Sequence, residues 1–196
     1  MQHLDDSARP STATTPASRA AAPASGRHVA VLGHFHAPNS YAVHRPDGGR
    51  SWLIAWTIGG AGRFGHGTTT VTATPRTLIV AAPSRAIAQS YATVDAPWHF
   101  WWMHVRLRPT WTPLVTPWTV GDGLMVTSIA GDGDADRVTA AFARARRDVV
   151  GTSAPSSDDG PDAIWVSSDT STDLVLNALE EVLLVAARSP ASATAD

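Results

Sequence analysis

The chain of 196 residues contains neither cysteine nor lysine, and each absence excludes a class of function. Without cysteine there is no disulfide bond and no thiolate metal site, which is compatible with a reducing cytoplasm. All 15 basic residues are arginine, and 17 acidic residues outweigh them, for a net charge of −2. This balance offers no basic face to neutralise phosphates, so we expect no direct DNA contact from this chain.

Long apolar runs are also lacking. No segment is long enough to span a bilayer, and prolines and serines interrupt the N-terminal region where a signal peptide would need a continuous apolar core. We therefore expect a cytoplasmic protein without a membrane partner. Residues 1–27 are mostly Ala, Ser, Thr and Pro, a composition typical of a disordered tail, and residues 188–196 have the composition of a linker.

Short apolar segments separated by glycine and proline dominate residues 28–118. The segments are 29–32, which Gly33 is expected to end, then 51–58, 69–72, 78–80, 87–94 and 98–107. Short strands at such close spacing are typical of an antiparallel sandwich or small barrel. The sequence therefore predicts a β-rich α+β fold with its barrel over 28–118.

Helical periodicity replaces this pattern within residues 119–187. A helix is predicted from about residue 135 to 150, after a cap at Asp134, with its apolar residues Val138, Ala141, Phe142, Ala145 and Val149 on one face. A second helix is predicted to begin near 170–173 and to end at Ala187. Residues 151–169 read as a mostly irregular loop, from which 164–166 dock back onto the fold.

One stripe of the second predicted helix is polar apart from a single leucine. At about 100° per residue, the stripe comprises Asp173, Asn177, Glu180, Glu181, Leu184 and Arg188. Leu184 is either an ordinary exposed leucine or part of a face that packs on a partner subunit.

His34 and His36 raise the possibility of a metal site, because residues two apart in a strand point the same way. Metal-binding cupins use such a pair with a nearby glutamate and a later histidine. Here the only glutamates lie on the second predicted helix, and a site would need His66, His99 or His104 together with a carboxylate that is not evident. We therefore expect structural or pocket-lining histidines and no metal cofactor.

Nucleophilic catalysis lacks its usual residues as well. There is no cysteine and no Gly-x-Ser-x-Gly elbow, so the prediction is a protein that is not an enzyme.

Tryptophans cluster between residues 98 and 111. In a strand, Trp98, Phe100 and Trp102 would share one face, while Trp101 and its neighbours His99 and Met103 would share the other. Large aromatic residues usually fill a core. Aromatic rings beside arginine also suit a sugar, whose C–H face packs on an indole and whose hydroxyls need fixed donors. Arg45 is placed to enter the mouth of such a barrel.

The order of these motifs resembles a known family. Gly33-His34-Phe35, then Tyr41 with Arg45-Pro46, then residues 53–62, Pro75, Pro83 and residues 98–111 resemble the N-terminal ligand-binding and dimerisation domain of AraC-type transcriptional regulators. Residues 177–184 look like the dimerisation helix of that domain. The resemblance implies a cupin-like barrel, a jelly roll or double-stranded β-helix, followed by two C-terminal helices. It also implies a homodimer, with antiparallel helix pairing, and a sugar or similar small molecule inside the barrel.

The same resemblance implies a set of ligand-binding residues. Arg45 and Trp102 match an arginine and a tryptophan that contact the sugar in the arabinose-responsive member. Two other contact positions differ, since Phe100 replaces a histidine and Gln89 falls near a tyrosine, for which Tyr91 can substitute. Because these two contact positions differ, the ligand is expected to differ from arabinose. The expected ligand-binding set also includes Phe35, and the expected dimerisation set is Asp173, Asn177 and Leu184.

Family members continue into a domain with two helix-turn-helix units, and this chain ends in the linker-like segment. Three interpretations follow. The chain is the sensing and dimerisation part of a regulator, a metal-dependent cupin enzyme that uses His34 and His36, or a standalone dimerisation module that inhibits full-length regulators.

Overall fold

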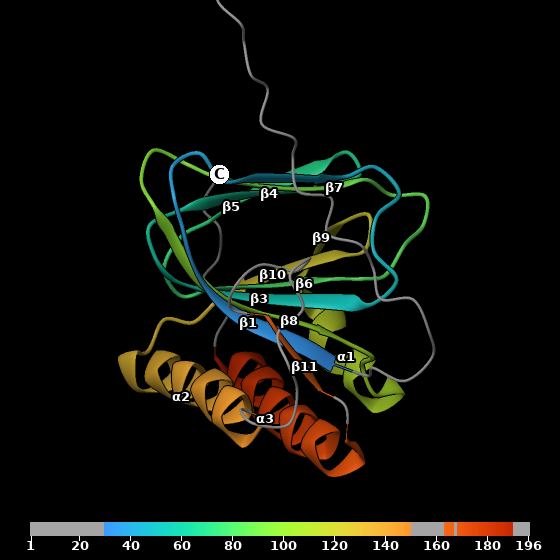
Figure 1. Ribbon diagram of the computed structural model, residues 1–196, viewed down its shortest axis with the longest axis vertical. Coiled ribbons are helices and arrows are strands. Elements are labelled where there is room, and N and C mark those ends of the chain that lie inside the picture. Colours follow the sequence, from blue (N-terminus) through green and yellow to red (C-terminus); the bar gives the residue numbers. More distant parts are fainter. Residues whose placement is uncertain (1–29, 150–162, 167, 190–196) are drawn as a thin grey trace, which may run out of the picture.

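The computed structural model describes residues 30–149, 163–166 and 168–189, so the predicted N-terminal tail and most of the 151–169 loop lie outside it. The strands form two antiparallel sheets that face each other, and helices cover the outer side of the larger sheet (Figure 1). This is the β-rich, cupin-like fold with C-terminal helices that the sequence predicts.

The larger sheet has seven strands in the order β11-β1-β8-β3-β6-β10-β9, and the smaller has four in the order β2-β7-β4-β5. The larger sheet contains β1 (Ala30–Ala37), β3 (Trp52–Gly59), β6 (Thr77–Ala81), β8 (Trp98–Val105), β9 (Thr119–Gly121), β10 (Leu124–Ser128) and β11 (Ile164–Val166). The smaller sheet contains β2 (Ala42–Arg45), β4 (Gly62–His66), β5 (Thr69–Ala73) and β7 (Gln89–Thr93).

Three α-helices accompany the sheets: α1 (Thr112–Val115), α2 (Asp132–Val149) and α3 (Asp169–Arg188), with 3-10 turns at Pro109–Trp111 and Thr116–Trp118. The predicted apolar face of α2 is buried throughout. The N-cap of α3 is Ser168, whose hydroxyl accepts a hydrogen bond from the Ser171 amide, so the helix begins earlier than predicted. None of the described helices is both long and apolar enough to cross a membrane.

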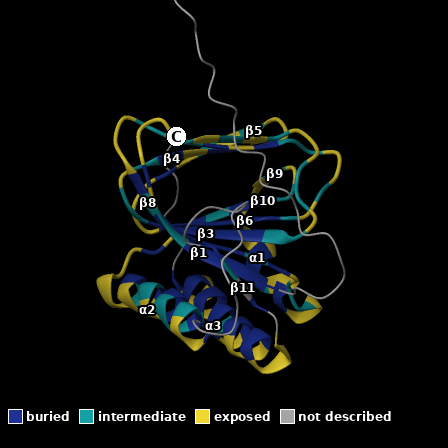
Figure 2. Cartoon of the chain, in the orientation of Figure 1, coloured by how far each residue is buried: buried dark blue, intermediate teal, exposed yellow. Residues whose placement is uncertain are grey.

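The larger sheet is buried on both of its faces, which Figure 2 shows as a dark blue layer between the helices and the smaller sheet. Trp98, Phe100 and Trp102 of β8 point between the two sheets. Trp101 and Met103 point instead toward α2 and α3. This confirms the predicted alternation along the strand. We call the region between the two sheets the barrel interior.

Two predicted boundaries are wrong. β1 does not end at Gly33 but continues to Ala37, because the missing side chain leaves room for the indole of Trp102, the residue opposite on β8. β9 and β10 lie within residues 119–187, where we expected a helical segment, yet both are strands of the larger sheet. The pairing of β10 with β6 therefore extends the β structure to Ser128. Residues 164–166 do dock back, as β11 beside β1.

Candidate functional site

Three polar side chains form a row across the inner face of the smaller sheet. In the strand register, Gln89 of β7 lies opposite Arg45 of β2 on one side and His66 of β4 on the other. Directly opposed residues in an antiparallel sheet project to the same face. Gln89 and His66 are only 1% and 0% exposed, so this face is the barrel interior. We call Arg45, Gln89 and His66 the polar row.

An apolar row adjoins the polar row. Tyr91 lies opposite Val43 and Phe64, two positions from the polar row on each strand. The Tyr91 hydroxyl donates a hydrogen bond of 2.6 Å to Gln89 Oε1, and burial raises the pKa of this phenol, which keeps it protonated. The Arg45 guanidinium carbon lies 5.8 Å from the centroid of the Tyr91 ring. Gln89 thus has its acceptor oxygen engaged and its amide nitrogen left for other partners.

His104 of β8 connects the polar row to the larger sheet. Arg45 Nη1 lies 3.3 Å from His104 Nε2, and Ser51 Oγ lies 3.0 Å from His104 Nδ1. Burial, and then the charge of Arg45, lower the pKa of His104 to about 3. The imidazole is therefore neutral near pH 7. Because Arg45 is only a donor, Nε2 accepts from it and the Nδ1–H donates to Ser51.

Several buried polar atoms in this region have no hydrogen-bond partner among the described residues. In the barrel interior they are Arg45 Nε, Gln89 Nε2 and Trp102 Nε1. The atoms on Arg45, Gln89 and Trp102 are all donors. An unsatisfied buried donor costs about 1–3 kcal/mol, and native proteins keep few of them. Their concentration in one region suits a small molecule that carries acceptor oxygens.

Aromatic rings line the barrel interior beside these donors. The Phe35 ring centroid lies 5.8 Å from both Phe100 and Trp102, and Phe100 stacks on Trp98 at 3.9 Å. Tyr41 completes the group at 6.1 Å from Phe35, and burial raises its pKa to about 12. These rings provide apolar surface against which a ligand can pack.

The structure places all six residues of the predicted ligand-binding set at the barrel interior, although they come from four strands. Arg45, Gln89 and Tyr91 lie on the smaller sheet, and Phe35, Phe100 and Trp102 lie on the larger one. Sequence reasoning missed Ser51, and it named His66 and His104 as possible metal ligands without connecting them with this group. The alternation of His104 with Phe100 and Trp102 was available as a signal for His104. His66 and Ser51 depend on strand pairing that the sequence does not display.

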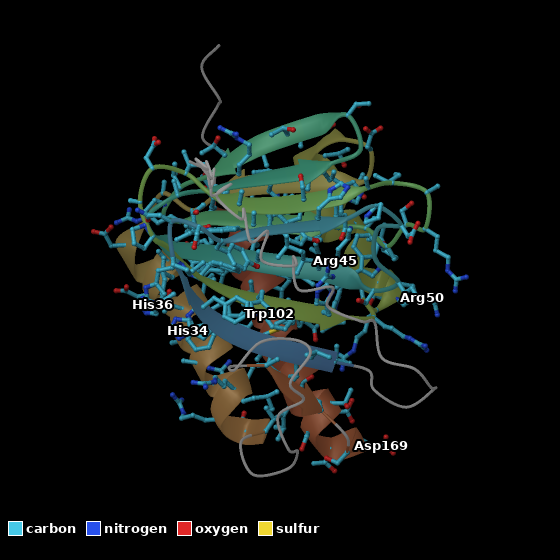
Figure 3. The ribbon with its side chains drawn as sticks, turned by 45° about the horizontal axis from the view of Figure 1, so that its top comes forward. His34, His36, Arg45, Arg50, Trp102 and Asp169 are labelled. Atoms are coloured by element: carbon cyan, nitrogen blue, oxygen red, sulfur yellow. The ribbon has the colours of Figure 1, made fainter. Side chains whose placement is uncertain are left out.

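A second group of histidines lies on the other face of the larger sheet. The ligand atoms of His34, His36 and His99 all lie within 4.8 Å of one another. Figure 3 shows His34 and His36 on the opposite side of the view from Arg45, with Trp102 between them. Among the described residues, these three histidines are the group whose potential ligand atoms come close enough to share a metal ion. The described residues of the barrel interior form no such group. The interior metal site of a cupin enzyme is thus not assembled by these residues.

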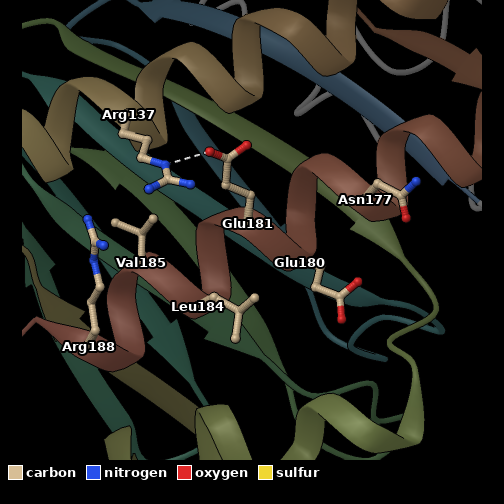
Figure 4. Close-up of a pocket in the computed structure, with 7 residues that line it drawn as sticks. All are labelled: Arg137, Asn177, Glu180, Glu181, Leu184, Val185 and Arg188. Carbon is tan, nitrogen blue, oxygen red and sulfur yellow. Dashed lines mark hydrogen bonds and ion pairs between the residues drawn. The ribbon is translucent and has the colours of Figure 1, made fainter.

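The outer face of α3 presents the predicted polar stripe. Asp173, Asn177 and Leu184 are exposed, Leu184 to 51%. A surface groove of about 400 Å³ runs along this face (Figure 4), and its lining comprises Arg137, Asn177, Glu180, Glu181, Leu184, Val185 and Arg188. The lining of the groove is thus mostly charged or polar, and Leu184 is its exposed apolar side chain.

The charged groups of the α3 face are largely paired within the chain. Glu180 accepts from Arg108 Nη1 at 3.0 Å and from the Trp111 indole at 3.1 Å. Glu181 accepts from Arg137 Nε at 2.6 Å and from Arg144. These pairs hold α3 against the turn at 109–111 and against α2. Arg108 Nη2 also lies 4.0 Å from Asp173 Oδ1 and 3.5 Å from Asn177 Oδ1. Both of these side chains and Leu184 are nevertheless exposed to a second molecule.

No protein-family model matches the chain, and no curated protein matches it either. Similar solved structures include the AraC-like transcriptional activator CuxR, which is 11% identical, with 85% of this chain and 55% of that chain covered and a TM-score of 0.49. Apo ToxT K231A from Vibrio cholerae is 10% identical, with 80% and 53% covered and a TM-score of 0.43. A cupin superfamily protein from Desulfitobacterium hafniense is 11% identical, with 43% and 72% covered and a TM-score of 0.32.

The chain spans about half the length of the CuxR and ToxT chains that it matches. These similarities are too low to indicate a ligand or an assembly for this chain.

Proposed function

We propose that this chain is the small-molecule-sensing and dimerisation domain of an AraC-type regulator of transcription. In this proposal the ligand is a sugar or a similar polar metabolite, it is held in the barrel interior, and no covalent chemistry takes place. The domain acts in the cytoplasm as a homodimer. DNA recognition would require a separate domain with helix-turn-helix units.

The observation that carries the ligand proposal is the set of unsatisfied donors on Arg45, Gln89 and Trp102. Hydroxyl and ring oxygens of a sugar are acceptors for these three groups. Aromatic rings beside the donors offer a flat surface for the sugar's C–H face, as Trp102 and Phe100 do here. Donors and rings together favour a ligand that is polar at its edge and apolar on one face.

Ligand binding at Arg45 has a route to the rest of the fold. Arg45 lies on the smaller sheet, and its hydrogen bond to His104 bridges to the larger sheet. A ligand that accepts from Arg45 Nε binds the same guanidinium whose Nη1 forms this bridge, so it can shift the group relative to His104. In this proposal, ligand binding therefore alters how the two sheets are held together. The change can reach the helices, because they pack on the larger sheet.

Titration calorimetry of the purified chain tests the ligand proposal. The panel comprises neutral pentoses and hexoses, sugar acids and small polar metabolites. Arg45→Ala should weaken binding of the active compound by about 10- to 150-fold, since a hydrogen bond from a charged group contributes about 1.5–3 kcal/mol. Arg50→Ala is the matched control, because Arg50 lies nearby in sequence but is exposed (Figure 3).

Two outcomes would count against this ligand site. If Arg45→Ala binds the compound as tightly as the wild type, Arg45 does not contact it. If no compound of the panel binds, the barrel interior is not a site for sugars and related metabolites. Gln89→Leu, which removes the amide without adding charge, gives an independent check on the same polar row.

Dimerisation is proposed to use the outer face of α3. In an antiparallel pair of α3 helices centred between Glu180 and Glu181, Asp173 is as far from the centre as Arg188. Asp173 would then face Arg188 of the second copy, and Asn177 would face Leu184. The same register places Glu180 opposite Glu181 of the second copy, where Arg108, Arg137 and Arg144 already neutralise these carboxylates within each chain. Arg188, which pairs with Asp134 in its own chain, would be shared with Asp173 of the second copy. With the central carboxylates neutralised, opposite charges at the ends and an apolar side chain within the contact suit an isologous interface.

Sedimentation velocity over a range of concentrations tests this assembly. The wild type is expected to dimerise, and Leu184→Glu is expected to be monomeric because it introduces a negative charge into the contact. Val120→Glu is the control, since Val120 on β9 is also 51% exposed but lies away from α3. A wild type that is monomeric throughout, or a Leu184→Glu variant that dimerises normally, would refute dimerisation through α3.

A further inference from the structure

We propose that His34, His36 and His99 form a binding site for one zinc ion on the helix side of the larger sheet. This site is separate from the ligand site of the barrel interior and does not depend on it.

The strand register brings the three imidazoles together. His36 of β1 lies directly opposite His99 of β8, and His34 lies two positions further along β1 on the same face. The ring centroids of His36 and His99 are 3.5 Å apart, and those of His34 and His99 are 4.6 Å apart. Three potential ligands thus converge from two rigid, hydrogen-bonded strands rather than from loops.

The distances fit a single ion. His34 Nε2 and His99 Nε2 are 2.6 Å apart, and the ligand atoms of all three residues lie within 4.8 Å of one another. Tetrahedral zinc with bonds of about 2.0–2.1 Å separates its ligand nitrogens by roughly 3.3 Å. Small rotations of the rings therefore bring three nitrogens to bonding distance around one point.

The donor set disfavours magnesium and calcium and favours metals that bind imidazole, of which zinc is one. Among the described residues it consists of three imidazole nitrogens without a carboxylate, and the chain has no cysteine to supply a thiolate. Imidazole ligands suit zinc, nickel and copper, whereas magnesium and calcium require oxygen ligands. Three histidines leave a fourth tetrahedral position for water or another small ligand.

Surrounding residues orient the rings while leaving the group accessible. The His34 imidazole stacks on Trp101 with centroids 3.8 Å apart and planes inclined by 11°, and Trp101 in turn stacks on Phe142 of α2. Gly59 of β3 lies beside His99 in the register, so β3 places no side chain over that flank. His36 is exposed to solvent. The group is therefore held in place and open to an ion from solution.

The same strands separate this site from the barrel interior. Phe35 alternates with His34 and His36 along β1, so its side chain lies on the other face of the sheet. An ion held by the histidines does not contact the proposed sugar. A variant that abolishes zinc binding is accordingly expected to retain sugar binding, and a variant that abolishes sugar binding is expected to retain zinc binding.

Zinc titration of the untagged chain tests the proposal. The protein is first treated with a chelator and dialysed, then titrated with zinc chloride by calorimetry, and bound metal is measured by elemental analysis. One zinc per chain is expected. His36→Ala and His99→Ala should each weaken zinc affinity by more than the roughly 10- to 100-fold caused by loss of an outer-shell partner. His44→Ala, at an exposed histidine of β2, should bind zinc as the wild type does.

Cobalt(II) supplies a second measurement. Tetrahedral cobalt gives intense visible absorption bands, and these should appear with the wild type and be absent from the double variant His36→Ala/His99→Ala. Far-UV circular dichroism confirms that the variants are folded. The proposal is overturned if the double variant binds zinc with the stoichiometry and affinity of the wild type, or if the wild type takes up no zinc.

Discussion

Replacing Gly33 by alanine tests how closely the indole of Trp102 packs on β1. A β carbon at residue 33 would lie 2.6 Å from Trp102 Cε2 and Nε1 and 2.7 Å from Cζ2. These distances are far inside van der Waals contact, so the ring or the strand has to move. The backbone at Gly33 does not have a positive φ, so steric overlap is the term that opposes alanine.

Two opposing effects set the magnitude. Alanine in a strand is favoured over glycine by about 0.5–1 kcal/mol, because less chain entropy is lost on folding. Overpacking of a buried site costs about 1–3 kcal/mol. The steric term is larger, so we expect Gly33→Ala to reduce the free energy of unfolding by about 0.5–2 kcal/mol.

Urea unfolding at neutral pH measures this change. A slope of about 1–3 kcal/mol/M converts the expected loss into a midpoint lowered by roughly 0.5 M. Gly133→Ala in α2 is the matched control, since no atom lies within 4 Å of its added carbon. That control should be at least as stable as the wild type, because alanine is the better helix former, although Gly133 lies in the first turn of α2 where the gain is smaller than in a helix interior.

A second background identifies the clashing group. In Trp102→Leu the indole is absent, so Gly33→Ala should no longer destabilise the protein. If Gly33→Ala is as stable as the wild type, or if it costs as much without the indole, the close packing of Trp102 on Gly33 is refuted.

Three further predictions concern stability, and urea midpoints test each. Between about pH 6.5 and pH 4 the wild type should lose stability, because the pKa of His104 is about 3 when folded and the unfolded chain binds the proton first; an equal loss in His104→Gln would contradict this. Thr139→Val should cost about 1–3 kcal/mol, because the buried Trp56 indole loses its acceptor at 2.9 Å, and an unchanged midpoint would count against it. Asp95→Gly should gain up to about 1 kcal/mol, since the φ of 59° at Asp95 suits glycine, and a loss of stability would be the contrary result.

Local periodicity accounts for what the sequence predicted well. The alternation from Trp98 to Met103 predicted two faces with different neighbours, and those faces point to the barrel interior and to the helices. The apolar spacing from Val138 to Val149 predicted the buried face of α2. Both patterns follow from the geometry of one element, whose period determines which residues share a face.

Weak local signals account for the missed elements. β2 and β4 are short strands with polar residues or glycine, AVHR and GRFGH, and neither has a clear apolar alternation. Gly33 reads as a strand end in the sequence, because its role depends on an indole from β8 that lies far along the chain. The strand conformation of these residues therefore depends on neighbours that are distant in sequence.

The polar row likewise combines one residue that the sequence predicted with neighbours that only the tertiary structure brings beside it. Arg45 was predicted as a ligand-facing residue from its place before a strand and from a family resemblance. Its position beside Gln89 and His66 follows from pairing among β2, β7 and β4, which no period in the sequence encodes. The contact with His104 likewise requires the two sheets to face each other.

By itself the sequence determined the strands and helices that have clear apolar periodicity, such as β3, β8, α2 and α3, because hydrophobic periodicity is local and is imposed by the geometry of each element. It also determined that His34 and His36 share a face. Only the tertiary structure decided which face that is, that His99 joins the pair, and that Arg45, Gln89 and His66 align. Those outcomes depend on strand register across long separations in sequence, and register is set by the packing of the whole sheet rather than by any single segment.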